Sequence, residues 1–130
     1  MTASEMASAA RRFMHGAATK GARVTPHQGT AFGSWPRAAA LLARQALEQG
    51  LDDLWGAVSP RVREASRHAQ LLCLGEFIRD EELVSGARYA WHGLSRACHH
   101  QVYELPPTEA ELSTWLDAVD RLLAHDPLRR

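Results

Sequence analysis

The stretch PPTEAELSTWLDAVDRLL, residues 106–123, carries the clearest structural signal in the chain. Two prolines precede Thr108, and Glu111 follows three residues later, which is the Thr-x-x-Glu capping box that opens many α-helices. Behind this box, apolar side chains recur every three or four residues, as on the buried face of a helix. They are Leu112, Trp115, Leu116, Val119, Leu122 and Leu123. The stretch therefore predicts a helix that begins within residues 106–111 and buries one face.

The segment upstream, residues 80–99, predicts a second amphipathic helix. Asp80, Glu81 and Glu82 stand at its start, where negative charge favours the positive end of the helix dipole. At about 100° per residue, the apolar side chains fall in one arc. The arc holds Leu83, Val84, Ala87, Ala90, Trp91, Leu94, Ala97 and Cys98. We expect this arc to face the core.

Two further helices are expected before it. Leu47, Leu51 and Leu54 recur at helical spacing in a helix from about Pro36 to Trp55. Ser59 and Pro60 then open another helix that runs to about Ile78. The expected breaks lie near residues 56–59, 76–80 and 100–107. Because no segment alternates with a period of two, no sheet is expected, and short connections predict an all-α, antiparallel bundle of four helices, or at most five.

Residues 1–33 differ from the rest of the chain. They are rich in glycine, show weak periodicity, and carry Arg11, Arg12, Lys20 and Arg23 against the single acid Glu5. This composition predicts a loose basic N-terminal arm with one short helix near residues 4–15. Residues 34–126 are expected to form the helical bundle domain.

Length and charge narrow the choice of function class. The chain has 130 residues, a formal net charge of zero and a pI near 7.1, so one domain is expected and no global charge marks a nucleic-acid or membrane partner. No run approaches the roughly 18 apolar residues of a membrane span. The two cysteines, Cys73 and Cys98, occur in apolar helical contexts that fit a reducing compartment. We expect a cytoplasmic protein with no membrane partner and no cofactor.

The outer arc of the helix predicted over residues 83–99 is unusual in its charge. It carries Ser85, Arg88, His92, Ser95, Arg96 and His99, which we call the basic stripe. His100 and Tyr103 follow just past it, and no acid occurs between Glu82 and Glu104. Three interpretations remain open at this point: the solvated face of a bundle helix, a site for an anion such as phosphate, and a metal site.

Chemistry favours phosphate among the possible sites. A helical zinc pair needs histidines four residues apart, whereas His92 and His99 are seven apart with no carboxylate nearby, so no metal is expected. Arginine binds phosphate in a bidentate manner, and histidine can act as acid or base on a ribose hydroxyl or a leaving oxygen. The predicted catalytic residues are Arg96, His99 and His100. The predicted phosphate-binding or supporting residues are Arg88, His92, Ser95 and Tyr103.

These residues also carry a resemblance. A small all-α bundle with an arginine, a nearby histidine and then a tyrosine late in the sequence resembles the HEPN superfamily, helical domains found in many prokaryotic toxin and defence ribonucleases. The stretch LLARQALEQGLDDLW, residues 41–55, is similar to such domains as well, and the resemblance covers residues 36–124. It implies a homodimer that cleaves RNA without a metal in a cleft shared by two subunits. By this resemblance Arg96 would bind phosphate, His99 or His100 would be the acid or base, and Tyr103 would support the pocket.

A second class of function competes with this one. In it the protein is a non-enzymatic interaction or dimerisation module, in which most of the tryptophans Trp35, Trp55, Trp91 and Trp115 fill the core. The basic stripe would then dock on an acidic helix, such as the one that carries Asp117 and Asp120. If Arg88 and Arg96 were both paired with Asp117 or Asp120 of the same chain, the module would be favoured over a phosphate site.

Overall fold

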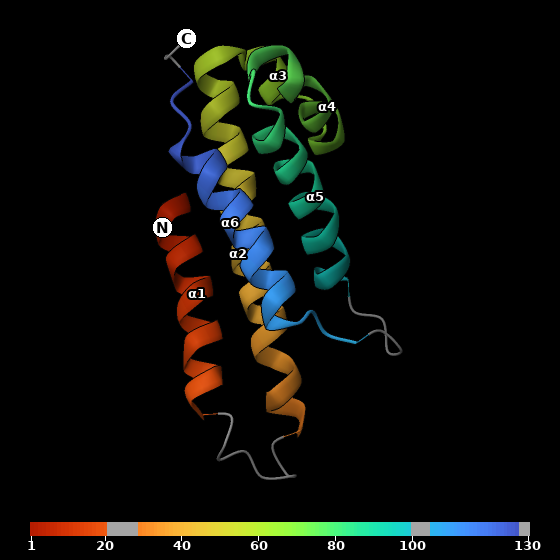
Figure 1. Cartoon of the computed structure of the whole chain (residues 1–130). Coiled ribbons are helices and arrows are strands. Elements are labelled where there is room, and N and C mark those ends of the chain that lie inside the picture. Colours follow the sequence, from red (N-terminus) through yellow and green to blue (C-terminus); the bar gives the residue numbers. More distant parts are fainter. Residues whose placement is uncertain (21–28, 100–104, 128–130) are drawn as a thin grey trace.

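The computed structural model describes residues 1–20, 29–99 and 105–127, and these residues form helices without any strand (Figure 1). The helices are α1 (Ala3–Lys20), α2 (Gly29–Val58), α3 (Pro60–Arg63), α4 (Arg67–Phe77), α5 (Glu81–Cys98) and α6 (Glu109–Ala124). The prediction of an all-α helical bundle is confirmed.

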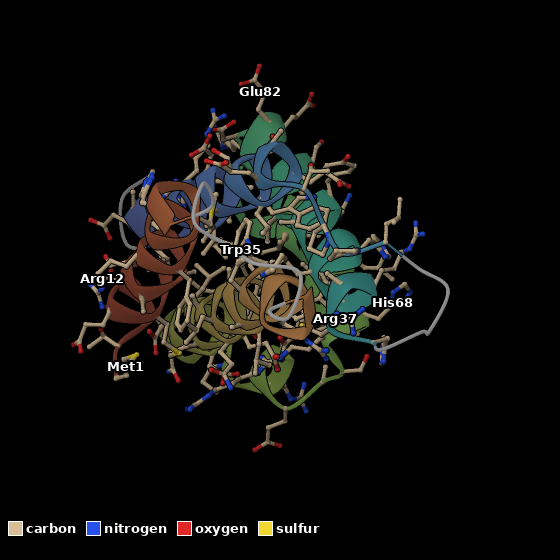
Figure 2. All side chains as sticks on the ribbon, turned by 90° about the horizontal axis from the view of Figure 1, so that it is seen from below. Met1, Arg12, Trp35, Arg37, His68 and Glu82 are labelled. Atoms are coloured by element: carbon tan, nitrogen blue, oxygen red, sulfur yellow. The ribbon has the colours of Figure 1, made fainter. Side chains whose placement is uncertain are left out.

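Four long helices make the body of the bundle. α1, α2, α5 and α6 alternate in direction along the bundle, while α3 and α4 lie at one end, in the connection from α2 to α5 (Figure 1). α2 packs against α1, α5 and α6, so it is the central element. Seen from below, Arg12, His68 and Glu82 stand on the outside and Trp35 lies nearer the centre (Figure 2). Because α2 and α5 run in opposite directions, the end of α5 and the start of α2 lie at the same end of the bundle (Figure 1).

The predicted apolar stripes form the core. The predicted stripe of α6 is buried except for Leu123, which is partly buried. The predicted arc of α5 is buried at Leu83, Val84, Ala87, Ala90 and Leu94. Trp91, Ala97 and Cys98 complete the arc as partly buried side chains packed against the core. Two of the tryptophans, Trp55 and Trp115, are buried, and Trp35 and Trp91 pack at the edge of the core.

The prediction of a loose arm is wrong for residues 3–20. α1 is longer than the short helix expected near residues 4–15, and it packs along α2 with Ala7, Ala10 and Met14 buried. Its buried face consists mainly of alanines, which produce a weak hydrophobic signal yet let two helices approach closely. α2 likewise begins at Gly29, upstream of the predicted start at Pro36, which lies inside the helix.

The helix predicted over Ser59–Ile78 is divided into α3 and α4 by a turn at residues 64–66. The Ser66 side chain caps α4 by accepting a hydrogen bond from a backbone N–H of its first turn, at 3.1 Å. The buried Gln70 donates to the backbone carbonyls of Arg63 and Ala65, at 2.9 and 3.1 Å. The break is stable because these side chains satisfy backbone groups that the turn leaves without helical partners.

The starts of α5 and α6 agree with their predictions. Asp80 caps α5 by accepting a hydrogen bond from the backbone of Leu83, at 3.2 Å. Thr108 and Glu111 form both hydrogen bonds of the expected capping box at the start of α6. Within the described part of the chain, no helix combines the length and apolar character that crossing a membrane would require.

Candidate functional site

The structure divides the basic stripe of α5 between two environments. Arg88, near the middle of the helix, donates from Nε to the carbonyl of Leu71 at 2.9 Å and from an Nη to that of Leu72 at 3.1 Å. Both carbonyls belong to α4. Arg88 thus fastens α5 to α4 and lies at a structural contact, although the sequence predicted it as a phosphate ligand.

Two other predicted supporting residues stand apart from any described pocket. His92 is exposed on the outer face of α5. The Ser95 hydroxyl is buried, and it has no hydrogen-bond partner among the groups that the structure describes. Neither side chain lines the pocket at the end of α5. The basic stripe is therefore not one continuous site.

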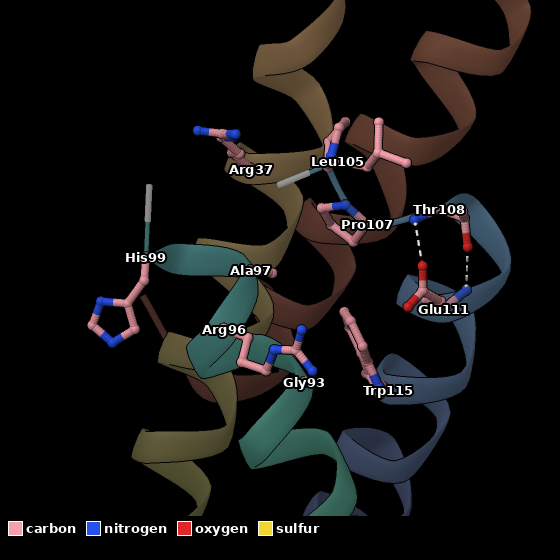
Figure 3. Close-up of a pocket in the computed structure, with 11 residues that line it drawn as sticks. Arg37, Gly93, Arg96, Ala97, His99, Leu105, Pro107, Thr108, Glu111 and Trp115 are labelled. Carbon is pink, nitrogen blue, oxygen red and sulfur yellow. Dashed lines mark hydrogen bonds between the residues drawn. The ribbon is translucent and has the colours of Figure 1, made fainter. Parts of the chain in front are cut away.

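Arg96 and His99, by contrast, line a pocket of about 250 Å³ where α5 ends (Figure 3). The pocket lies between the last turns of α5, the start of α6 with the residues before it, and Arg37 of α2. Arg96 is directed towards Trp115, whereas Arg37 and His99 stand at the rim with their side chains turned outwards (Figure 3). Two of the three predicted catalytic residues thus share one concave surface.

One end of this pocket is closed by a very close contact between α5 and α6. Trp115 lies across Gly93, and a Cβ atom placed on Gly93 would come within 2.3 Å of the indole ring. Only glycine leaves room for the ring there. Trp115 is 6% exposed, and its indole N–H has no acceptor among the described residues.

The opposite wall combines the capping box with apolar residues. Glu111 Oε1 accepts a hydrogen bond from the backbone N–H of Thr108 at 3.0 Å, and Thr108 Oγ1 accepts one from the backbone N–H of Glu111 at 3.1 Å (Figure 3). Leu105, which is 92% exposed, and Pro107 continue this wall. The pocket therefore has a basic side, an apolar side and one carboxylate that is engaged in capping.

Arg37 is a pocket residue that the sequence analysis missed. In the sequence it follows Trp35 and Pro36 and looks like a solvated residue in the first turn of a helix. The predicted antiparallel topology is the signal that could have indicated Arg37, because an antiparallel arrangement brings the start of α2 to the end of α5. His100 and Tyr103, the remaining predicted site residues, lie outside the described residues.

The acidic face of α6 has a different partner from the one considered for it. Asp117 and Asp120 accept hydrogen bonds from Arg11 of α1, at 2.9 and 2.6 Å. These ion pairs join the first helix to the last. Arg88 is one of the two arginines whose contacts with these acids would have favoured an interaction module, and it donates instead to carbonyls of α4.

Cys98 is placed poorly for nucleophilic chemistry. It lies half-buried against the core, and burial raises the pKa of its thiol, an effect that hydrogen bonding from Arg44 only partly opposes. A raised pKa reduces the thiolate population that would react. Among the described residues, no three His, Cys, Asp or Glu side chains lie close enough together to hold a metal ion.

Comparison with models of protein families finds no match, and comparisons with curated proteins and with solved structures find none either.

Proposed function

We propose that this chain is an HEPN-like helical domain that binds the phosphate of RNA or of a nucleotide in the pocket at the end of α5. The observation that carries the proposal is that arginines from two helices, Arg37 and Arg96, line one pocket together with His99. Arginine is suited to phosphate because its planar guanidinium donates two parallel hydrogen bonds.

The size of the pocket supports a small anionic group. Its volume of about 250 Å³ lies below the roughly 300–1,000 Å³ of sites that enclose drug-sized ligands. A phosphate with its adjoining sugar suits such a space. The apolar wall of Leu105 and Pro107 can contact the carbon atoms of the sugar or the face of a base.

The test is isothermal titration calorimetry of a short single-stranded RNA with the wild type and two variants, Arg96→Gln and Arg37→Gln. Because hydrogen bonds to charged groups contribute about 1.5–3 kcal/mol, each substitution should weaken binding roughly 10-fold to 100-fold. Arg12→Gln is the matched control, since Arg12 is exposed on α1 and points away from Arg37 (Figure 2). Affinity should also fall with added salt. Binding that both pocket variants leave intact would contradict the proposal.

The proposal extends to metal-independent cleavage by a homodimer, which is what the resemblance implies. One copy supplies Arg96 as a phosphate ligand and His99 as an acid or base, and a second copy would supply the same pair. Labelled RNA should be cut in the presence of a chelator by the wild type, and cut less by Arg96→Ala, His99→Ala or His100→Ala. Sedimentation should show a dimer. A monomer at tens of micromolar would count against the shared cleft and leave phosphate binding as a separate question.

A further inference from the structure

The outer face of α4 and α5, which we call the α4–α5 face, carries two large apolar side chains that the bundle leaves uncovered. Leu72 of α4 is 59% exposed and Tyr89 of α5 is 64% exposed. Within the described helices, no other large apolar side chain is exposed to that extent. Because apolar surface is stabilised by removal from water, these two side chains favour a face that another molecule covers.

Arg88 holds the two helices of this face together. It directly precedes Tyr89, and it donates from an Nη to the carbonyl of Leu72 at 3.1 Å and from Nε to that of Leu71 at 2.9 Å. Only residues 78–80 separate α4 from α5, so the two helices are also tied at one end. The face is thus fixed before any partner arrives, which lowers the entropy that association costs.

The charge of the α4–α5 face changes sign from one end to the other. The end at which α4 passes into α5 has four acids and two arginines, a net charge of −2: Glu76, Arg79, Asp80, Glu81, Glu82 and Arg121 of α6. Arg121 pairs with Asp80 and Glu82, yet the Glu82 side chain is still 83% exposed. Towards the other end of the two helices stand His68 and His92, both exposed, and no acid follows Glu82 in α5. A histidine donates a hydrogen bond to a carboxylate whether it is neutral or charged.

The spacing on α4 is symmetric about Leu72. His68 lies four residues before it and Glu76 four residues after it, so the three stand on one side of the helix, over about 12 Å along its axis. A two-fold axis that passes by Leu72 across the helix would set His68 opposite Glu76 of the partner subunit. The same axis would set the acidic start of α5 opposite the half of α5 that carries His92. Pairing of the helices in the same direction would instead set acids against acids.

From the exposed apolar pair, the Arg88 link and the graded charge together, we infer that the α4–α5 face binds a second copy of this chain, with the paired helices running in opposite directions. The pocket at the end of α5 is a separate surface, because no residue of α4 lines it. The inference therefore goes beyond the proposed function and does not rest on it. A shared cleft would need a second contact between copies, and both contacts together would give a tetramer.

The experiment measures association of the full chain by sedimentation equilibrium. Leu72→Ser and Tyr89→Ser should each weaken association at least ~10-fold, because buried side chains at the centre of an interface contribute most and a two-fold axis removes each contact twice. Phe13→Ser is the matched control. Phe13 is 47% exposed on α1, which packs on α2 and α6 and not on α4 or α5. This variant should associate as the wild type does.

A charge exchange tests the direction of the pairing. His68→Glu would set two acids opposite each other, and Glu76→Lys would set two basic groups opposite each other, so each should weaken association by about 5-fold. The double variant exchanges the two signs and should associate more tightly than either single variant. A double variant that associates no better than the two single variants would overturn the antiparallel pairing.

The remaining outcomes separate this inference from the proposed function. A wild type that is monomeric at about 100 μM overturns the inference. A dimer that His99→Ala dissociates, and that Leu72→Ser and Tyr89→Ser leave intact, places the contact at the pocket and also overturns it. RNA binding that Tyr89→Ser retains and Arg96→Gln loses supports two separate surfaces. Circular dichroism of each variant shows that the helices are intact, so that a loss of association is not a loss of folding.

Discussion

Arg88 and Arg96 lie on the same outer face of α5, eight residues apart, and the structure uses them in different ways. α4 covers the side of α5 next to Arg88, and the guanidinium of Arg88 donates to two α4 carbonyls. At the end of α5 the neighbours are instead the start of α2 and of α6, and Arg96 lines a pocket between them. Two arginines on one helical face thus have different surroundings: Arg88 joins two helices, and Arg96 faces a pocket.

The difference shows what decides the role of a charged residue on a bundle helix. The helical spacing that places Arg88 and Arg96 on one face says nothing of which neighbouring backbone will lie over each. Backbone carbonyls of α4 lie beside Arg88 and accept its hydrogen bonds, whereas a pocket lies beside Arg96. The role of each arginine is therefore a property of the neighbouring element as much as of α5.

The largest effect is expected from Gly93→Ala, which would disrupt the pocket that Arg96 lines. The added Cβ would meet the Trp115 ring at 2.3 Å, so the indole or one of the helices must move. Overpacking of this kind typically costs 1–3 kcal/mol, and we expect about 3 kcal/mol from urea denaturation. Phosphate binding should be lost with the closed end of the pocket.

Gly16→Ala is the control for that substitution. Gly16 lies in α1, and, apart from its two chain neighbours and the nearby backbone of its own helix, no atom comes within 4 Å of a Cβ placed there. Alanine is the better helix former, so this variant should be more stable by up to about 1 kcal/mol. A Gly93→Ala protein as stable as the wild type would show that Trp115 can shift without cost.

The next prediction compares substitutions of Arg88 and Arg96 directly. Arg88→Gln should lower the free energy of unfolding by about 1.5 kcal/mol, because it removes two charge-assisted hydrogen bonds to the carbonyls of Leu71 and Leu72. It should leave RNA affinity unchanged. Arg96→Gln, in contrast, should cause a clear loss of RNA affinity. If both variants weakened RNA binding equally, the whole basic stripe, and not the pocket alone, would be the binding site.

A smaller effect concerns the first residue of α4, Arg67, which donates to both carboxylate oxygens of Asp52 on α2, at 2.6 and 3.2 Å. Hydrogen bonding from Arg67 lowers the pKa of Asp52. The stabilisation is thus complete above the unfolded pKa of about 3.9 and is lost as pH falls through the lower folded value. Asp52→Asn should reduce stability by about 1 kcal/mol at neutral pH and flatten its decline in acid.

Asp53→Asn provides the matched control for Asp52. Asp53 is the exposed neighbour and accepts a hydrogen bond from Gln49 on its own helix, at 3.0 Å. Its substitution should leave the acid limb of the stability curve in place. If stability depended on pH in the same way in the two variants, the Arg67–Asp52 ion pair would not be the source of the loss of stability in acid.

The smallest effect extends the comparison to a third arginine. Arg11 pairs with Asp117 and Asp120, whose side chains are 71% and 49% exposed. Exposed ion pairs contribute little and are screened by salt. Arg11→Gln should therefore cost about 0.5 kcal/mol at low salt and less at about 0.5 M salt. A loss that is large and independent of salt would mean that α1 depends on this contact.

The parts of the fold that the sequence predicted are those with local causes. Asp80 and Thr108 cap α5 and α6 through hydrogen bonds to residues three positions away, so the sequence pattern contains the whole interaction. The large apolar stripes of these helices could likewise be predicted, because they follow from the helical spacing of apolar residues. The packing of α1 escaped prediction because its buried face is mostly alanine, and the break between α3 and α4 depends on Gln70 reaching back to Arg63 and Ala65.

The candidate site was predictable only along one helix. Arg96 and His99 were found because they share a face of α5, and Arg37 was missed because it reaches the pocket from α2. Gly93 gave no signal either, since its role depends on which ring of α6 lies opposite. Residues that make a site by meeting across helices can be inferred from sequence only after the topology is known.

The position of Trp115 also gives the protein an intrinsic optical reporter. Its indole lines the pocket, while Trp55 makes an edge-to-face contact with Phe77 at the far end of α2 and Trp91 lies beneath Arg44. Among the described pocket residues, Trp115 is the only indole. In a protein with phenylalanine at the other three tryptophan positions, the indole fluorescence would come from the closed end of the pocket alone, and its spectrum would follow occupancy without any attached label.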